Sequence, residues 1–235
     1  MSTGRNQILA GIRRSLRRGA LDGAAAAQAE ERLANPPRGL IPARTKGLDH
    51  KGLVDLFEKY AIEVGATITR VPNLAAIPDA VASFLAGQNL PPDIAMAPDP
   101  LLEAVPWDKR PMLSIRKGRS DGRDPVGLSA AFAGVAETAT LMLTSGPGGP
   151  STVNFLPETH MVLLPASRVV GPLEDAWSRL RAHGPKPLAG AAMPRTVNFI
   201  TGPSRTGDIE QKILMGAHGP RRLHILLVED ETVGA

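Results

Sequence analysis

The segment TGPSRTGDIEQKILMGAHGP, residues 201–220, holds the residue types best suited to chemistry in this chain. Its glycines let the backbone adopt conformations closed to other residues, and its hydroxyls and guanidinium supply hydrogen-bond donors. Such a loop suits a carboxylate or a phosphate. The candidate anion-binding residues in it are Gly202, Ser204, Arg205, Thr206 and Asp208. His218, near the end of the segment, is a candidate catalytic residue that could accept a proton.

A helix start inside this segment would strengthen the anion site. Asp208, followed by Gln211 three residues later, fits a capping box, which predicts a helix over residues 208–215. Exposed N–H groups at such a helix start favour an anion. The alternative is a tight strand-to-helix connection with no ligand, in which Arg205 pairs with a carboxylate such as Glu137 and His218 is an ordinary loop histidine.

A second candidate site lies in the segment GVAETATLML, where Glu137 stands among small apolar residues just before a predicted strand, Thr138–Thr144. A carboxylate in such a place could act as an acid, a base or a nucleophile. Glu137 is therefore a candidate catalytic residue, and Thr138 a candidate for binding the substrate. The alternative is a glutamate at the rim of the sheet that makes only structural hydrogen bonds.

The glycine-rich segment TSGPGGPSTVN, residues 144–154, is not a phosphate loop. Pro150-Ser151 replaces the last glycine of G-x-G-x-x-G, and no Gly-Lys-Ser/Thr follows. The segment predicts a flexible loop or a lid. His160 opens the next apolar run, where it either lines a pocket or is structural.

Several absences exclude classes of function. The chain has no cysteine, so it offers no thiolate for an iron–sulfur cluster. Its five histidines are dispersed and it has no H-E-x-x-H, so we expect no metal site. Nothing marks a flavin or nicotinamide site, and we expect no cofactor on this chain. The net charge is only +4 and no basic patch alternates with aromatics, so we expect no nucleic acid partner. No apolar run approaches the roughly 20 residues of a membrane span.

The first 48 residues predict a helical arm and a linker, followed by a domain at 49–235. Helical patterns cover about 5–18 and 22–34, and the prolines of residues 36–48 favour an extended linker. Five arginines with no acid precede Asp22, which is also typical of a mitochondrial transit peptide. A helix of the mature protein is the alternative that we favour.

Helical stripes alternate with short apolar runs from Asp49 onward, which predicts an α/β fold with a mainly parallel sheet flanked by helices. Leu128–Ala136 predicts a strand end and a short helix. The runs that predict strands are Thr67–Val71, Ile94–Ala97, Met112–Arg116, Thr138–Thr144, His160–Leu164, Val197–Thr201 and Leu223–Val228. Ligands of parallel sheets bind beyond the carboxyl ends of strands, and this rule selects the loop after Val197–Thr201.

At this point the chain resembles a known family. GVAETATLML, NFLPETHMVLLP, TGPSRTGDIEQKILMGAHGPRRLHILLVED and the early NQILAGIRRSL are similar to the LUD-domain family, in its lactate utilisation protein C branch. The family usually has glycine where this chain has Ala139. The resemblance implies a fold like the NagB/RpiA and CoA-transferase superfamily.

The resemblance also implies a function. It implies a cytoplasmic subunit of a system that oxidises L-lactate to pyruvate, with two partner proteins that carry the iron–sulfur clusters. The lack of cysteine agrees with that division of labour. Two alternatives stay open. One is a free-standing enzyme like the phosphosugar isomerases or CoA-transferases, and the other is a non-catalytic scaffold of the complex.

Overall fold

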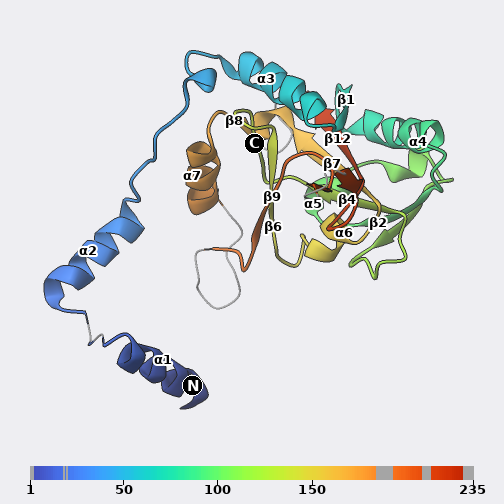
Figure 1. Cartoon of the computed structure of the whole chain (residues 1–235). Helices are drawn as coiled ribbons and strands as arrows, with labels where there is room; N and C mark the ends of the chain where they lie inside the picture. Colours follow the sequence, from blue (N-terminus) through green and yellow to red (C-terminus); the bar gives the residue numbers. More distant parts are fainter. Residues whose placement is uncertain (1–2, 18, 20, 184–192, 208–212, 230–235) are drawn as a thin grey trace. The chain divides into compact units, whose positions relative to one another are not determined.

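The computed structural model describes the chain except for residues 1–2, 18, 20, 184–192, 208–212 and 230–235 (Figure 1). The chain divides into two compact units, Met1–Leu40 and Ile41–Ala235. Residues 41–48, which the sequence pattern assigns to the linker, group with the second unit. Thr45 is buried there, and Arg44 Nη1 donates a hydrogen bond to the Glu137 carbonyl over 3.0 Å.

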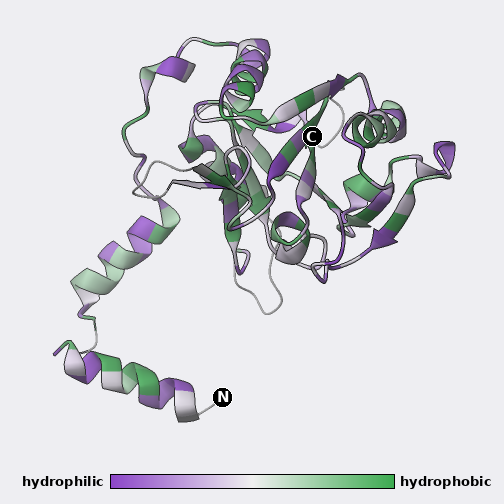
Figure 2. Cartoon of the chain, turned by 45° about the vertical axis from the view of Figure 1, so that its right-hand side comes forward, coloured by the Kyte–Doolittle hydropathy of each residue, from purple (hydrophilic) through white to green (hydrophobic). Residues whose placement is uncertain are grey.

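The first unit holds two helices, α1 (Thr3–Ser15) and α2 (Gly23–Ala34), as the sequence predicts. The Asp22 side chain caps α2 by accepting a hydrogen bond from the Ala25 N–H, at 2.7 Å. Figure 2 shows apolar and polar residues mixed along both helices. The large apolar side chains of this unit, among them Ile8 and Leu33, are exposed.

A six-stranded parallel sheet forms the centre of the second unit, in the order β1-β12-β7-β4-β2-β3. The strands are β1 (Thr67–Val71), β2 (Asp93–Met96), β3 (Ser114–Lys117), β4 (Val126–Ala130), β7 (Thr159–Pro165) and β12 (Arg222–Val228). All of β7 is buried, and so is β12 after its first residue. Their near-continuous apolar runs reflect a sheet that is covered on both faces.

Helices cover the two faces of this sheet. α3 (His50–Glu63) packs Val54, Phe57 and Ala61 into the same buried cluster as alternate residues of β7 and β12. α4 (Ile77–Gly87) and α5 (Pro100–Glu103) pack in a second cluster with the other alternate residues of these strands. The mainly parallel α/β fold predicted from the sequence is therefore confirmed.

A smaller four-stranded sheet, in the order β8-β5-β6-β9, packs on the α3 side of the central sheet. Its strands are β5 (Ala133–Val135), β6 (Thr140–Thr144), β8 (Val169–Val170) and β9 (Val197–Ile200), and α7 (Leu173–His183) packs on its other face. The two sheets lie close together: a Cβ on Gly134 would stand 2.8 Å from Leu164 Cδ2. The short helix α6 (Ser151–Phe155) lies between β6 and β7 in the chain.

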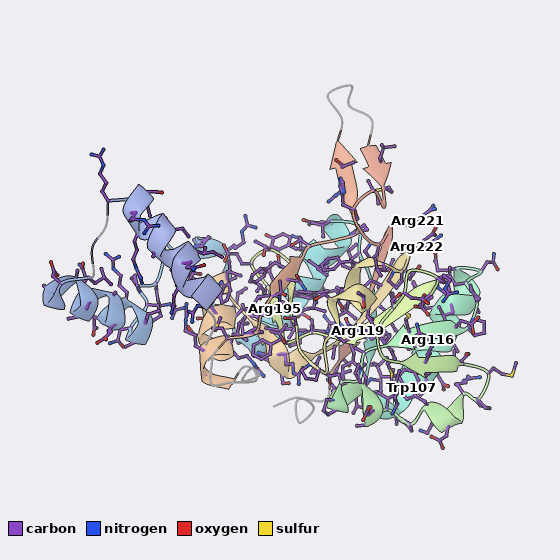
Figure 3. All side chains as sticks on the ribbon, turned by 90° about the horizontal axis from the view of Figure 1, so that it is seen from below. Trp107, Arg116, Arg119, Arg195, Arg221 and Arg222 are labelled. Atoms are coloured by element: carbon purple, nitrogen blue, oxygen red, sulfur yellow. The ribbon has the colours of Figure 1, made fainter. Side chains whose placement is uncertain are left out.

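The structure contradicts two predicted helices, the second of them only at residues 213–215. Leu128–Ala136 contains the end of β4 and all of β5, and no helix. In the region 208–215, residues Ile213–Met215 form β11, which pairs in antiparallel fashion with β10 (Arg205–Gly207). Asp208 and Gln211 of the predicted cap lie outside the described residues. Figure 3 shows this hairpin projecting from the body of the second unit.

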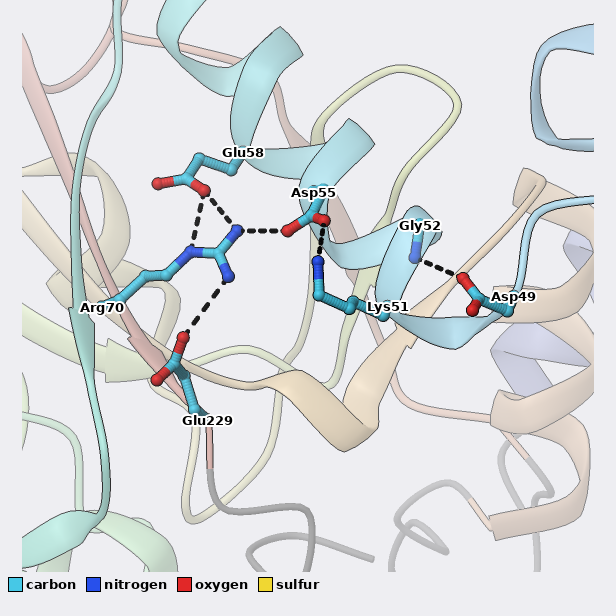
Figure 4. A network of polar contacts seen from close by, with 7 residues as sticks. All are labelled: Asp49, Lys51, Gly52, Asp55, Glu58, Arg70 and Glu229. Carbon is cyan, nitrogen blue, oxygen red and sulfur yellow. Dashed lines mark hydrogen bonds and ion pairs between the residues drawn. The ribbon is translucent and has the colours of Figure 1, made fainter.

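An ion-pair network on Arg70 joins α3 to two strands of the central sheet (Figure 4). The β1 guanidinium donates to Asp55 and Glu58 of α3, and it reaches Glu229, just beyond β12, at 3.3 Å. Hydrogen bonding, first of all to Glu58, raises the pKa of Arg70 above its usual value. The network therefore fixes α3 beside the edge strand.

The described helices include none that is both long and apolar enough to cross a membrane.

We expect Ala139 to tolerate glycine but not valine. Ala139 is buried in the turn after β5 with a φ of 51°, which costs an L-residue about 1–2 kcal/mol. Glycine removes that strain but loses a buried methyl, about 0.8 kcal/mol, and costs about 0.5–1 kcal/mol of chain entropy. Ala139→Gly should therefore change the free energy of unfolding by less than about 1 kcal/mol.

Ala139→Val adds a β-branched side chain at the same positive φ in a packed core, and should cost more than about 2 kcal/mol. Urea titration of both variants checks this. An Ala139→Val protein as stable as the parent would show that the turn does not hold this conformation.

Candidate functional site

Two of the cavities in the described part of the second unit contain candidate site residues or lie at strand ends, and we name them the loop cavity and the strand-end cavity. The loop cavity, of about 280 Å³, is lined by Phe155, His160, Phe199, Ile200, Thr201, Gly202, Pro203, Ser204, Arg205, His218, Gly219, Pro220 and Leu223. The strand-end cavity, of about 360 Å³, is lined by Asp99, Pro100, Ser129, Ala130, Phe132, Leu143, Thr144, Ser145, Gly146, Pro147, Gly148, Gly149, Asn154 and Arg168. Both volumes are in or near the range of small-ligand sites.

Ser204 holds the walls of the loop cavity together. Its N–H donates to the Pro220 carbonyl at 2.8 Å, and its carbonyl accepts from the Gly216 N–H at 2.8 Å. Its hydroxyl accepts from the His218 N–H at 3.2 Å. Two loops that are separate in the chain, before β10 and after β11, are thereby joined into one wall.

Gly202 positions the same wall against α3. Its φ is 69°, and a Cβ at this position would stand 2.6 Å from the Val64 carbonyl oxygen. Only glycine allows this close approach without a shift of the backbone. Gly202 therefore has a structural reason for its place, besides any contact with a ligand.

The structure brings together four of the predicted site residues. Gly202, Ser204, Arg205 and His218 all line the loop cavity. Arg205 and His218 are exposed, so a ligand could reach both. Thr206 follows on β10 but is not part of the wall, and Asp208 lies outside the described residues.

Glu137 and Thr138 lie apart from this wall, in the turn between β5 and β6. The Glu137 N–H donates to the Gly171 carbonyl at 3.2 Å, and no ion pair joins Glu137 to Arg205, although the structure describes both. Thr138 is connected to the cavity through hydroxyls: its Oγ1 lies 2.7 Å from that of Thr140, which lies 2.6 Å from that of Thr201. Thr201 lines the loop cavity.

His160 occupies the base of the loop cavity at the start of β7. It is fully buried, its Nε2 lies 2.7 Å from Ser129 Oγ, and its Nδ1 has no hydrogen-bond partner in the described part of the chain. Burial disfavours the imidazolium and lowers the pKa of His160 to about 3. The ring is therefore neutral, with one nitrogen free to donate or accept, depending on its tautomer.

The loop after β9 does not lie at the carboxyl ends of the parallel strands, contrary to the prediction. β9 belongs to the smaller sheet, and the loop cavity lies at the amino ends of β7 and β12, where His160 and Leu223 line it. The strand-end cavity does lie at these carboxyl ends. Asp99 comes after β2, Ser129 and Ala130 end β4, and Arg168 comes after β7. Sequence reasoning missed Ser129 and Arg168, because no local pattern marks them.

No group of three or more histidine, aspartate or glutamate side chains that could hold a metal ion occurs among the described residues. Several arginines of the second unit form ion pairs with acidic side chains. Arg116 reaches Asp124 at 2.5 Å, and Arg221 and Arg222, which lie together in Figure 3, both reach Glu158 at 3.9 Å. Arg205 of the loop cavity has no such ion pair with a described residue.

These features define an α/β domain with ligand-sized cavities on two sides of a parallel sheet. A DUF162 family protein of Deinococcus radiodurans, known from its crystal structure, shares this fold, with a TM-score of 0.57 and 19% identity over 77% of this chain and 99% of that one. A sequence model of the LUD domain matches residues 121–228.

Related sequences also match this chain, one of them over more than the residues that the LUD-domain model covers. Lactate utilization protein C of Geobacillus thermodenitrificans is 30% identical over 166 residues, 66% of this chain and 68% of that protein. The protein of the same name in an Exiguobacterium species is 35% identical over 46% of each chain. An uncharacterized protein of Neisseria meningitidis is 40% identical over 43% of this chain and 41% of its own. The chain belongs to the LUD-domain family. It spans about half the length of several curated relatives that it matches.

We expect two buried histidines to make stability depend on pH. Burial lowers the pKa of His160 to about 3 and that of His224 to about 4, from 6.5. As pH falls below 6.5, the unfolded chain takes up protons that the folded chain refuses, so the free energy of unfolding falls until the folded pKa is reached. Between pH 6.5 and about pH 5 each histidine should contribute a loss of about 2 kcal/mol.

His224→Gln should remove about half of this loss, whatever it does to stability at neutral pH. Urea titrations at about pH 7 and pH 5 measure the difference, and His50→Gln, at an exposed histidine, is the matched control. If the His224→Gln protein loses as much stability on acidification as the parent, burial does not keep His224 neutral.

Proposed function

We propose that this chain is a subunit of a cytoplasmic system that oxidises L-lactate to pyruvate, and that it binds an anionic ligand in the loop cavity. The observation that carries the proposal is the family membership, because several relatives are named lactate utilization protein C. The wall formed by Ser204, Arg205 and His218 supports it, since it offers a positive charge and polar groups in a cavity open to solvent.

The proposed chemistry of the loop cavity follows from its residues. The Arg205 guanidinium pairs with the carboxylate of the ligand, and the Ser204 hydroxyl and the N–H groups near Gly202 add hydrogen bonds. His218, which lines the same cavity, is the group that we propose to accept the proton of a hydroxyl. Glu137 is the second proposed catalytic group. Its neighbour in the chain, Thr138, is joined to the cavity wall through the hydroxyls of Thr140 and Thr201.

Oxidation of lactate to pyruvate releases two electrons and two protons. This chain has no cysteine to hold an iron–sulfur cluster, so the electrons pass to clusters on two partner proteins. The share of this chain is then to bind the anion and to take up a proton. The partners are part of the proposal.

The partnership predicts what a tagged chain brings with it. Affinity purification from the native cell under anaerobic conditions should recover two further proteins, together with iron and acid-labile sulfide. Mass spectrometry and metal analysis measure both, and a tagged protein unrelated to the system is the control. An eluate with iron and sulfide no higher than the control would contradict the partnership.

Arg205→Ala should weaken lactate binding by about tenfold to a hundredfold, because a hydrogen bond to a charged group contributes about 1.5–3 kcal/mol. Calorimetry and the rise of Tm with lactate measure this. Arg123→Ala, at an arginine whose side chain is 89% exposed, is the matched control.

Other outcomes favour the alternatives. Stabilisation by phosphosugars or CoA but not by lactate would favour a free-standing enzyme. Full lactate oxidation by a complex that contains the Arg205→Ala chain would favour a scaffold.

A further inference from the structure

The strand-end cavity lies where parallel sheets most often hold their ligands. Asp99 follows β2, Ser129 and Ala130 end β4, and Arg168 comes three residues after β7. All three strands are parallel neighbours through β4, so their carboxyl ends meet at one edge. The proposed lactate site is elsewhere, at the amino ends of β7 and β12.

Asn154 offers an amide to this cavity that nothing else uses. The residue lines the cavity, its exposed fraction is only 3%, and its side chain makes no hydrogen bond to another residue that the structure describes. Because the side chain lines the cavity, its amide can donate to and accept from a group that occupies the cavity.

The backbone holds Asn154 in its place. A Cβ on Gly127 would stand 2.2 Å from the Val153 carbonyl oxygen, so the absence of a side chain on β4 lets α6 lie directly on the strand. Val153 and Asn154 are both buried there. The amide is therefore presented from a rigid contact between a helix and the sheet, rather than from a free loop.

A short turn after β6 forms another part of the cavity wall. The N–H and carbonyl groups of Gly146 and Gly149 bond each other at 3.3 and 3.1 Å, and the Ser145 N–H donates to the Thr196 carbonyl at 2.9 Å. A Cβ on Gly149 would stand 2.3 Å from the Thr144 carbonyl oxygen. The segment predicted to be a flexible loop or lid is thus a hydrogen-bonded turn that shapes the cavity.

Arg168 supplies a positive charge to the cavity. Its Nη1 donates to the Ala131 carbonyl at 2.8 Å, which anchors the guanidinium. Burial lowers the pKa of Arg168, while the charge of Asp99 acts in the opposite direction, but an arginine remains charged near neutral pH. The wall therefore carries a cation, an amide, the Ser129 hydroxyl and the Asp99 carboxylate.

We propose that the strand-end cavity is a second binding site, which takes a small oxyanion, a carboxylate or a phosphate monoester, that also carries a hydroxyl group. The oxyanion lies against Arg168 and the Asn154 amide, which donate to it. The hydroxyl of the ligand donates to Asp99. Asp99 Oδ1 already accepts a hydrogen bond from the Leu101 N–H at 2.8 Å, so the ligand hydroxyl donates to Oδ2. An anion without a hydroxyl would bring a second negative charge near Asp99 without this contact, so the hydroxyl is the specific feature.

The second site is joined to the loop cavity by one contact. Ser129 Oγ, in the strand-end cavity, lies 2.7 Å from Nε2 of His160, which lines the loop cavity. A ligand that takes the Ser129 hydroxyl changes the hydrogen bond of that imidazole. Occupation of one cavity is therefore expected to change affinity at the other.

The test uses the full chain and four probes: glycerate, glycerol 3-phosphate, propionate and inorganic phosphate. Calorimetry should show binding of glycerate or glycerol 3-phosphate, and the stronger of the two identifies the anionic group. Propionate and inorganic phosphate, which lack the hydroxyl on carbon, should bind more weakly. If neither hydroxylated probe binds at millimolar concentration, the proposal is overturned.

Variants assign the binding to the cavity. Asn154→Asp is nearly isosteric and replaces the donor amide with an acceptor, so it should weaken binding about tenfold or more. Asn89→Asp, the same change at an exposed residue, is the matched control and should bind as the parent does. Circular dichroism shows whether Asn154→Asp folds. If it does not, Arg168→Lys replaces it, and this variant should also weaken binding of the probe.

Arg205→Ala separates this site from the proposed lactate site. It should leave binding of the hydroxylated probe within about twofold of the parent, since Arg205 does not line the strand-end cavity. If Arg205→Ala abolishes that binding and neither Asn154→Asp nor Arg168→Lys reduces it, the probe occupies the loop cavity. This inference is then overturned, while the proposed function stands.

Discussion

The parallel pairing of β4, β7 and β12 is the constraint on which the rest of this domain depends. Parallel strands must be connected by crossovers, which cover both faces of the sheet. Inside this covered sheet, the backbone N–H and carbonyl groups of each strand form their hydrogen bonds with the neighbouring strands. β7 pairs along its whole length with β12 and along five residues with β4. Because the strands are parallel, their amino ends lie together on one side of the sheet and their carboxyl ends on the other. The loop cavity lies at the amino ends, and the strand-end cavity lies at the carboxyl ends.

Close backbone approach at glycines makes both cavities possible. At Gly127 the helix α6 lies on β4, and at Gly202 the loop after β9 lies on the end of α3. A methyl at either place would meet a carbonyl oxygen at less than 3 Å. These contacts turn loops into fixed walls, so that polar side chains such as Asn154 and Arg205 are presented from a rigid frame.

Sequence patterns located most strands of the fold, because a buried strand of a parallel sheet is a short apolar run wherever it pairs. Thr67–Val71 matches β1 residue for residue. The patterns failed in two places. The small residues of Leu128–Ala136 fit a helix or a strand equally well. Leu128–Ala130 end β4, and pairing with β6 and β8 makes Ala133–Val135 the strand β5. A capping pattern at Asp208 predicted a helix, but Ile213–Met215 pairs with the strand at Arg205 instead.

The sequence by itself determined the arm of two helices, the apolar strands, the lack of thiolate ligands, and the segment that lines the loop cavity. Those properties depend on residue type and short spacing. Only the tertiary structure decided which strands share a sheet, and therefore which edge each loop faces. It also brought Ser129 beside His160, and Asn154 into one cavity with Arg168. Pairing between segments far apart in the chain leaves no local pattern, because each strand would be equally apolar beside any other partner.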